Sequence, residues 1–322
     1  KDFGLMKTIS VLIPTYNEEE NVEAVCKAVE DQIVQHCQGY NYEILFIDNK
    51  STDNTRPLIR ELCKKNKHVR AIFNCKNFGQ FNSPVYGLLQ TSGDCSIMFY
   101  ADFQDPVELI PTFVKYWEEG YKIVCGVKTA SKENPLMYQL RTIYYKLIKK
   151  FSSVEQIEHF TGFGLYDKSF IDVLRQLHDP TPFIRGIVAE LGPERKEIQY
   201  TQEKRRAGKS KNNFASLYDA AMLSFTSYTK VGMRLATFFG FIIAGFSFLI
   251  ALAYLIAKLA FWNLFSMGYA PMMIAVFFMG GVQLVFLGFL GEYIMAMNAR
   301  IMNRPLVVEE ERLNFDNSKE RQ

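Results

Sequence analysis

Two long apolar segments in the last third of the chain limit its possible folds more than any other feature. Residues 235–257 contain 23 consecutive positions without a charged side chain, and residues 270–291 contain 22. A helix needs about 20 mostly apolar residues to cross the hydrocarbon layer of a bilayer. We therefore expect two transmembrane helices near the C-terminus, with a large domain before them that lies outside the lipid.

Basic side chains lie before the first of these segments and after the second. Lys230 and Arg234 precede the first segment, Arg300 and Arg304 follow the second, and the stretch between the two segments carries only Lys258. Because cytoplasmic flanks of membrane helices carry an excess of Lys and Arg, both termini are expected in the cytoplasm. The expected units are a cytoplasmic domain over 1–211, an amphipathic juxtamembrane helix over 212–232, a membrane unit over 233–298 with spans at about 235–257 and 270–291, and a cytoplasmic tail over 299–322.

The segment just before the membrane unit is basic and then amphipathic. Residues 194–211 carry seven Lys or Arg against three Glu, and such a cluster attracts anionic lipid without any catalytic role. From Phe214 to Tyr228, aromatic and aliphatic residues recur on one helical face. That face fits a helix lying on the bilayer surface, and packing against the preceding domain is the alternative.

Charge and cysteine content exclude some other classes of protein. The formal net charge of +3 is too small to indicate a nucleic-acid partner. The six cysteines include no CxxC pair, and no histidine stands at zinc-finger spacing from them. We therefore expect reduced cysteines with a structural role.

The domain before the membrane unit alternates short apolar runs with helical patterns. Apolar residues at Val22, Val25, Val29 and Ile33 recur at spacings of three and four, which predicts an amphipathic helix. The apolar runs are typical of strands buried on both faces and cover residues 6–14, 42–48, 69–73, 96–101 and 121–126. This alternation predicts an α/β fold with a mostly parallel sheet.

Polar side chains follow three of these predicted strands. They lie at 14–18, 48–53 and 100–106, and none of these stretches contains the clustered glycines of a dinucleotide or phosphate loop. Ligands of parallel α/β sheets bind at the carboxyl ends of the strands. Acidic groups there suit hydroxyl or base contacts, or a hard cation that bridges two phosphates. A single such cluster is typical of a turn or a helix cap, but three at successive strand ends indicate a binding site.

Several short motifs continue this pattern along nearly the whole chain. They are Pro14-x-Tyr16-Asn17-Glu18, Asp48-x-x-Ser51-x-Asp53, Asn77-x-Gly79, Asp102-x-Gln104-Asp105-Pro106, Arg205-x-x-Gly208-x-Ser210-Lys211 and Asn303-Arg304-Pro305. In this series the chain resembles the inverting family 2 glycosyltransferases, and most of all their polyprenyl-phosphate branch. The resemblance implies a GT-A nucleotide-sugar-binding domain, followed by interfacial helices and a two-helix transmembrane hairpin.

The resemblance also implies a role for individual residues in binding the sugar donor. The residues expected to bind the nucleotide-sugar are Pro14, Tyr16, Glu18, Asp48, Asn77, Ser210 and Lys211. Asp102 and Gln104 would hold Mg²⁺ or Mn²⁺ on the diphosphate and so neutralise the leaving group. Asp102, Asp105 and Arg205 form the expected catalytic set.

Two further basic positions match residues that bind the acceptor lipid in this family. Lys128 and Arg141 would contact the phosphate of the lipid, and solvated surface is the alternative for both. Cations suit this step because the attacking and the leaving group are both anionic. The lipid phosphate is ionised at neutral pH, so no strong general base is required.

The chain departs from the family pattern at three places. Tyr100 stands where the metal motif has its first Asp, and Asn49 stands where a second Asp usually follows the second strand. Residues 162–165 read Gly-Phe-Gly-Leu, where the family often has Asp-Phe-Arg before a Leu. A different donor sugar or a weakened catalyst would each account for these changes.

The expected function is transfer of a monosaccharide from a nucleotide-sugar, with UDP expected as the nucleotide, to undecaprenyl phosphate at the cytoplasmic face of the bacterial plasma membrane. The product would be a lipid-linked monosaccharide for modification of cell-envelope glycans, and we expect a homo-oligomeric, multi-pass enzyme. The alternative is a non-catalytic scaffold or sensor in the membrane that binds a nucleotide-sugar. Transfer of a labelled sugar to polyprenyl phosphate would discriminate between the two.

Overall fold

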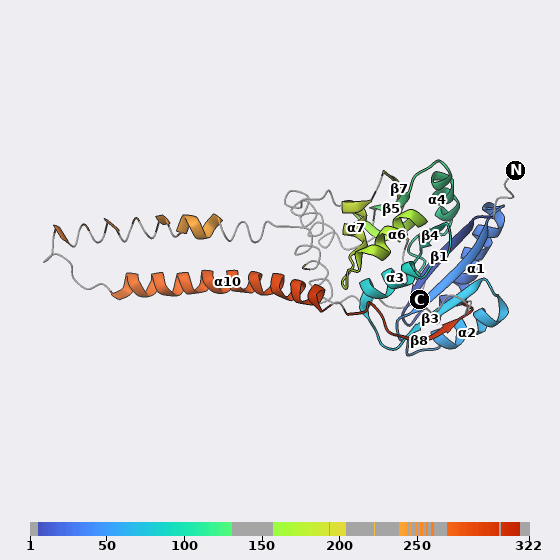
Figure 1. Ribbon diagram of the computed structural model, residues 1–322, viewed down its shortest axis with the longest axis horizontal. Coiled ribbons are helices and arrows are strands. Elements are labelled where there is room, and N and C mark those ends of the chain that lie inside the picture. The colour runs from blue at the N-terminus through green and yellow to red at the C-terminus, as the bar shows by residue number, and fades with distance from the viewer. Residues whose placement is uncertain are drawn as a thin grey trace.

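A computed structural model of the chain describes residues 6–130, 157–192, 194–203, 222, part of 238–260, 269–302 and 304–315. Figure 1 shows an α/β domain from which one long helix projects. The described strands are β1 (Thr8–Thr15), β2 (Asn41–Asp48), β3 (Val69–Asn74), β4 (Cys95–Met98), β5 (Ile123–Ala130), β6 (Phe160–Asp167), β7 (Arg195–Thr201) and β8 (Glu309–Leu313). The described helices are α1 (Val22–His36), α2 (Thr55–Lys65), α3 (Gly79–Leu89), α4 (Leu109–Glu118), α6 (Lys168–Leu177), α7 (Ile184–Leu191) and α10 (Tyr269–Ile301).

The eight described strands form one sheet in the order β7-β5-β6-β4-β1-β2-β3-β8. The pairs β4–β1, β1–β2, β2–β3 and β5–β7 are parallel, whereas β6 and β8 pair antiparallel with their neighbours. The prediction of an α/β fold with a mostly parallel sheet is therefore confirmed. The ends of β1, β2, β3 and β4 meet at one edge, as the sequence required for a site there.

Strand residues alternate between two apolar layers, one on each face of the sheet. In β1, Val11 and Ile13 contribute to the layer beneath α1, α2 and α4, while Leu12 contributes to the layer beneath α3, α6 and α7. Successive side chains of a strand point to opposite faces, so a continuous apolar run fills both layers. This is why β1 and β2 contain no polar–apolar alternation.

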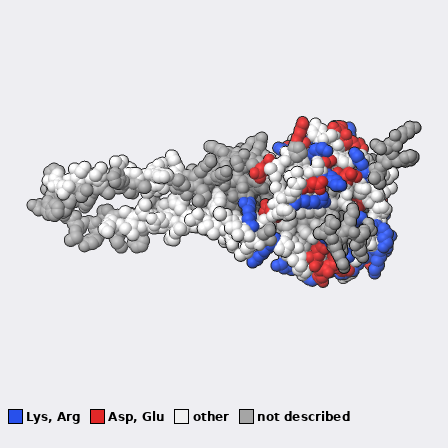
Figure 2. Space-filling view, viewed as in Figure 1, with Lys and Arg blue, Asp and Glu red and all other residues white. Residues whose placement is uncertain are grey.

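The part of the chain expected in the membrane is described only in part. Every described position between 238 and 260 is helical, and α10 spans the second apolar segment. Among the described residues one helix, Phe278–Ile301, is long and apolar enough to cross a bilayer, so the expected hairpin of two spans is not confirmed. In Figure 2, Lys, Arg, Asp and Glu gather on the α/β domain, and the projecting part is almost free of them.

The chain returns to the α/β domain after α10. β8 lies within the tail expected over 299–322, and it pairs with the edge of β3 (Figure 1). All six cysteines are free, and only Cys75 is exposed. Burial raises the pKa of Cys26 and of Cys63 to about 12, so these thiols stay protonated and unreactive at neutral pH.

Candidate functional site

The loops that follow β1 and β2 brace each other at the edge of the sheet. Thr15 and Asp48 are neighbours in the parallel register. Asn17 has a φ of 55°, a conformation that Asn adopts more readily than most residues. The backbone N–H of Asn17 donates to the Ser51 hydroxyl over 2.8 Å, and the Asn17 side chain accepts from the backbone N–H of Thr52 over 2.7 Å. The two loops therefore behave as one unit, which carries the expected donor residues.

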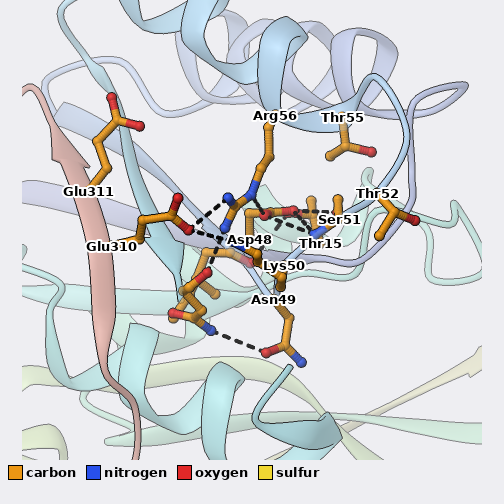
Figure 3. A network of polar contacts seen from close by, with 12 residues as sticks. Thr15, Asp48, Asn49, Lys50, Ser51, Thr52, Thr55, Arg56, Glu310 and Glu311 are labelled. Carbon is orange, nitrogen blue, oxygen red and sulfur yellow. Dashed lines mark hydrogen bonds and ion pairs between the residues drawn. The ribbon is translucent and has the colours of Figure 1, made fainter. Parts of the chain in front are cut away.

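Asp48 is the most deeply buried of these residues, with 0% of its surface exposed. Its carboxylate accepts hydrogen bonds from the backbone N–H and the hydroxyl of Ser51 and, over 2.5 Å, from Arg56 Nε. Arg56 also donates to the carbonyl of Asn74 over 2.6 Å and to Glu310 over 3.0 Å (Figure 3). A buried carboxylate requires a paired cation, which Arg56 supplies. Direct contact between Asp48 and a nucleotide stays a prediction.

The loop after β3 is held by Asn49, which replaces the usual second Asp. Its side-chain amide donates to Asn77 Oδ1 over 2.8 Å and to the carbonyl of Gly79 over 3.1 Å. Its oxygen accepts from the backbone N–H of Phe78 over 2.8 Å. An ionised carboxylate only accepts hydrogen bonds and could not make the first two. The departure at Asn49 therefore fits the local structure of this loop, and it places Asn77 at the same edge as Asp48.

The loop after β4 carries the expected metal ligands. Asp102 is 9% exposed, and its carboxylate accepts from the backbone N–H of Gln104 over 3.2 Å. Asp105 is buried, and its carboxylate accepts from the hydroxyl of Tyr200 in β7. Burial raises the pKa of Asp105, the charge of Lys128 and the hydrogen bond from Tyr200 oppose this rise, and Asp102 adds to it. Lys128 thus lies within electrostatic reach of Asp105.

Tyr100 and Gly162, two of the departures from the family pattern, face each other. The Tyr100 hydroxyl donates to the carbonyl of Thr161 over 3.1 Å, and a Cβ at Gly162 would lie 3.2 Å from the Tyr100 oxygen. Gly162 also has a φ of +102°, which disfavours any other residue. The tyrosine ring therefore reaches space that a side chain at position 162 would need, and the two changes fit together.

The charges around Tyr100 identify a cation that the sequence patterns missed. Burial raises the pKa of Tyr100, and the charge of Arg185 in the first turn of α7 acts against that rise. The nearby Asp105 and Asp102 add to the rise. The Tyr100 hydroxyl is therefore protonated at neutral pH, and Arg185 lies within electrostatic reach of it.

The structure brings most of the expected site residues to one edge of the sheet. Those at or just after the ends of β1, β2, β3 and β4 are Pro14, Tyr16, Glu18, Asp48, Asn77, Asp102, Gln104 and Asp105, and Lys128 lies in β5. Arg141, Arg205, Ser210 and Lys211 lie outside the described residues. No sequence pattern predicted a role for Arg56, Arg185, Tyr200 or Glu310, because each acts through a partner distant in the chain.

The described oxygen ligands fit a cation that is shared with a substrate. Among the residues that the structure describes, no group of three or more His, Cys, Asp or Glu side chains could enclose a metal ion. Mg²⁺ is often held by one or two carboxylates together with the phosphates of a substrate. Asp102 with the Gln104 side chain matches that arrangement better than it matches a site built from protein ligands alone.

Comparisons with known proteins identify the family of the chain. The profile of glycosyl transferase family 2 matches residues 10–175. The SfII prophage-derived bactoprenol glucosyl transferase of Shigella flexneri is 32% identical over 298 residues, which cover 92% of this chain and 96% of that protein. The putative glycosyltransferase CsbB of Bacillus subtilis is 31% identical over 300 residues, which cover 92% of this chain and 89% of that protein.

Among solved structures, the chain is similar to glucosyl-3-phosphoglycerate synthase from Mycobacterium tuberculosis, with a TM-score of 0.46 and 20% identity over 68% of this chain and 78% of that one. The predicted family and the GT-A type of α/β domain are confirmed by the family profile and the relatives above. Since the family profile matches half of the chain, and the Shigella relative aligns with nearly all of it, the chain is an enzyme of the transferase class that belongs to glycosyl transferase family 2.

Proposed function

We propose that this enzyme transfers a monosaccharide from a UDP-sugar to a polyprenyl phosphate, undecaprenyl phosphate in a bacterial cell, with inversion at the anomeric carbon. The observation that carries this proposal is the alignment with a bactoprenol glucosyl transferase over 92% of the chain. That length includes both the α/β domain and the long apolar helix. The product is a lipid-linked monosaccharide for cell-envelope glycans.

The donor lies across the ends of β1, β2, β3 and β4 in this proposal. Pro14, Tyr16, Glu18, Asp48 and Asn77 surround the nucleoside, and their loops are braced by the hydrogen bonds described above. Asp102 and Gln104 would hold Mg²⁺ or Mn²⁺ in this proposal. When bound, the cation neutralises charge on the leaving diphosphate. Arg205, Ser210 and Lys211 add further contacts to the same diphosphate.

The reaction is a single displacement. An oxygen of the lipid phosphate forms a bond to the anomeric carbon, and the bond from that carbon to the nucleoside diphosphate breaks. Lys128 and Arg141 hold the attacking phosphate, which is already ionised and gives up no proton. Asp105, buried beside Lys128, orients groups at the transfer point through its hydrogen bond with Tyr200. Fixed cations aimed at anionic groups are a major source of rate enhancement in such sites.

The membrane placement follows from the acceptor. A polyprenyl phosphate is held in the bilayer by its chain, so the site must face the membrane surface. We therefore propose that the site faces the cytoplasmic surface of the bacterial plasma membrane. The proposed arrangement has a cytoplasmic α/β domain over 1–211, a juxtamembrane helix over 212–232, and two spans over about 235–257 and 270–291. The described apolar helix Phe278–Ile301 supports the second of these spans.

The decisive test is sugar transfer by the purified full chain. The protein in detergent is incubated with undecaprenyl phosphate and, separately, with radiolabelled UDP-glucose, UDP-N-acetylglucosamine, GDP-mannose and TDP-glucose, with and without Mn²⁺. We expect labelled lipid from one UDP-sugar, and none without the lipid phosphate or after chelation of the metal. Labelled lipid from a GDP- or TDP-sugar alone would refute the UDP assignment. Nucleotide-sugar binding without lipid labelling from any donor would refute the proposed acceptor.

A further inference from the structure

The segment that follows α10 contributes an edge strand to the catalytic sheet. β8 pairs antiparallel with β3, with Phe73 opposite Glu311 and Asn74 opposite Glu309. Its sequence begins with three consecutive glutamates, Glu309 to Glu311. These charged side chains suit an edge strand, because charge there discourages pairing with other chains. Their ion pairs, however, differ from one glutamate to the next.

Glu310 lies near the end of β2, where the sugar donor is proposed to bind, whereas Glu311 does not. The Glu310 carboxylate is 3.0 Å from Arg56 Nη1 and 2.8 Å from Lys50 Nζ. Glu311 lies 2.6 Å from Arg60 Nη2, and Arg60 is one helical turn beyond Arg56 in α2. Figure 3 shows Glu310 beside Arg56 and Glu311 directed away from it. Both neighbouring glutamates of the strand thus pair with cations, and only the ion pairs of Glu310 lie next to expected site residues.

Arg56 joins three separate parts of the fold in this arrangement. Its guanidinium donates to Asp48 at the end of β2, to the carbonyl of Asn74 at the end of β3, and to Glu310 in β8. Guanidinium has five N–H donors in a rigid planar fork, whereas a lysine ammonium has no such fixed directions. Arg56 also lies over the Phe73 ring, 5.3 Å from its centroid. Its position is therefore fixed by all three strands.

A continuous series of contacts leads from β8 to the loop after β1. Glu310 contacts Arg56, Arg56 contacts Asp48, and Asp48 accepts the hydroxyl proton of Ser51. The same Ser51 hydroxyl accepts from the backbone N–H of Asn17 over 2.8 Å. Asn17 lies between Tyr16 and Glu18, both expected at the nucleoside. A change at Glu310 can therefore alter the position of the loop after β1, although the two segments are far apart in the sequence.

We infer that Glu310 and Arg56 are positioning residues for nucleotide binding, and that β8 is thereby part of the framework of the donor site. Glu310 holds the Arg56 fork, Arg56 fixes the buried Asp48, and Asp48 with Ser51 fixes the loop after β1. This inference rests on the proposed function, because the donor is a nucleotide-sugar there. It adds a requirement that the strand following the membrane helix be in place for tight nucleotide binding.

The experiment compares Glu310→Ala with Glu311→Ala in the full chain. Glu310→Ala removes the ion pairs with Arg56 and Lys50, and Glu311→Ala removes the ion pair with Arg60. Both changes are in the same edge strand, so a general loosening of β8 would show in both variants. The dissociation constants of UDP, GDP and TDP are measured by calorimetry in detergent with Mn²⁺, and thermal unfolding is followed in parallel. We expect Glu310→Ala to weaken binding of the preferred nucleotide at least about threefold, the scale of a partly exposed ion pair. Glu311→Ala should stay within about 1.5-fold of wild type, because its ion pair with Arg60 is of similar strength but does not contact Arg56 or Asp48.

A second variant guards against loss of β8 itself. Glu310→Gln keeps the shape and an acceptor oxygen but lacks the charge, and it should weaken binding in the same direction with an unchanged unfolding temperature. In turnover assays the KM for the donor should rise, with kcat preserved, for both Glu310 variants. Equal nucleotide affinity in Glu310→Ala, Glu311→Ala and wild type would overturn the inference. If the wild-type protein prefers GDP or TDP, only the proposed UDP donor is refuted. The ratio of nucleotide affinities between wild type and the Glu310 variants would still test the positioning role of Glu310. Wild type that binds none of the three would refute both.

Discussion

At the scale of single residues, Asp102 is the carboxylate on which the metal assignment depends. It lies just after β4 with little of its surface exposed, next to Gln104. We expect Asp102→Asn to lower kcat by about a hundredfold or more, the effect of removing a main electrostatic stabiliser. Steady-state transfer to polyprenyl phosphate measures it, with Asp172→Asn on the exposed side of α6 as the control. Activity within a few-fold of wild type, still dependent on metal, would show that another group holds the cation.

Tyr100 tests whether a departure from the family pattern is structural. Its hydroxyl makes a hydrogen bond with the Thr161 carbonyl, so Tyr100→Phe should cost about 1 kcal/mol of unfolding free energy. Turnover and metal affinity should change little, because the described contacts of the hydroxyl are with the Thr161 carbonyl and the Met98 sulfur, and neither is an expected ligand of the donor or the metal. Denaturation and activity are measured on the same preparation. A large loss of activity in a stable variant would show that the hydroxyl contacts the donor or metal-bound water.

Asp105 predicts a pH dependence with a definite sign. Burial raises its pKa above the ordinary value of 3.8, so the folded state binds the proton more tightly than the unfolded state does. As the pH rises from about 4 through the raised pKa, the unfolded chain loses its proton first, and the folded state loses stability. Asp105→Asn cannot titrate, and its amide oxygen can still accept from Tyr200. The unfolding temperature of the variant relative to wild type should therefore rise between pH 4.5 and 7.5. A difference that is constant over this range would contradict the raised pKa.

At the scale of elements, the sequence predicted those whose pattern is local. The strand expected at 69–73 became β3 (Val69–Asn74), and the helix carrying Val22 and Ile33 became α1 (Val22–His36). Strands buried on both faces can be predicted from sequence, because they appear as short, continuous runs of β-branched and other apolar residues. The polar clusters after β1, β2 and β4 were located by the same reasoning, since the carboxyl ends of parallel strands lie at one edge of a sheet. Their contacts with a sugar donor stay a prediction.

Elements defined by distant partners were not predictable in this way. β8 is highly charged, and its register with β3 is determined by side chains more than 200 positions earlier, such as the Arg56–Glu310 pair. Gly164 in β6 faces the carbonyl of Val124, which a Cβ would approach to 2.4 Å. That close approach explains why the Arg of the family pattern is absent at Gly164, and nothing within the sequence of β6 indicates it. Arg56 and Tyr200 were missed for the same reason, because their partners lie in other elements.

At the scale of the whole molecule, β8 constrains the membrane topology that is proposed above. It belongs to the same sheet as β1, so the residues after α10 lie on the same side of the bilayer as the α/β domain. With α10 as one crossing, the chain must cross an odd number of further times between β7 and α10. The apolar segment at 235–257 is long enough for one crossing. The pairing of β8 therefore supports two spans independently of the distribution of Lys and Arg.

This topology predicts which cysteines an impermeant reagent can reach. Among the described residues the exposed native cysteine is Cys75, next to the end of β3. Ser266 lies between the two apolar segments. In intact spheroplasts a charged maleimide should label Ser266→Cys, since the connection between the spans faces outward. Cys75 should react only after lysis, because the α/β domain faces the cytoplasm. Labelling of Cys75 before lysis would contradict a cytoplasmic α/β domain. Protection of Ser266→Cys until lysis would contradict an outward-facing connection between two spans, and either result would overturn the proposed topology.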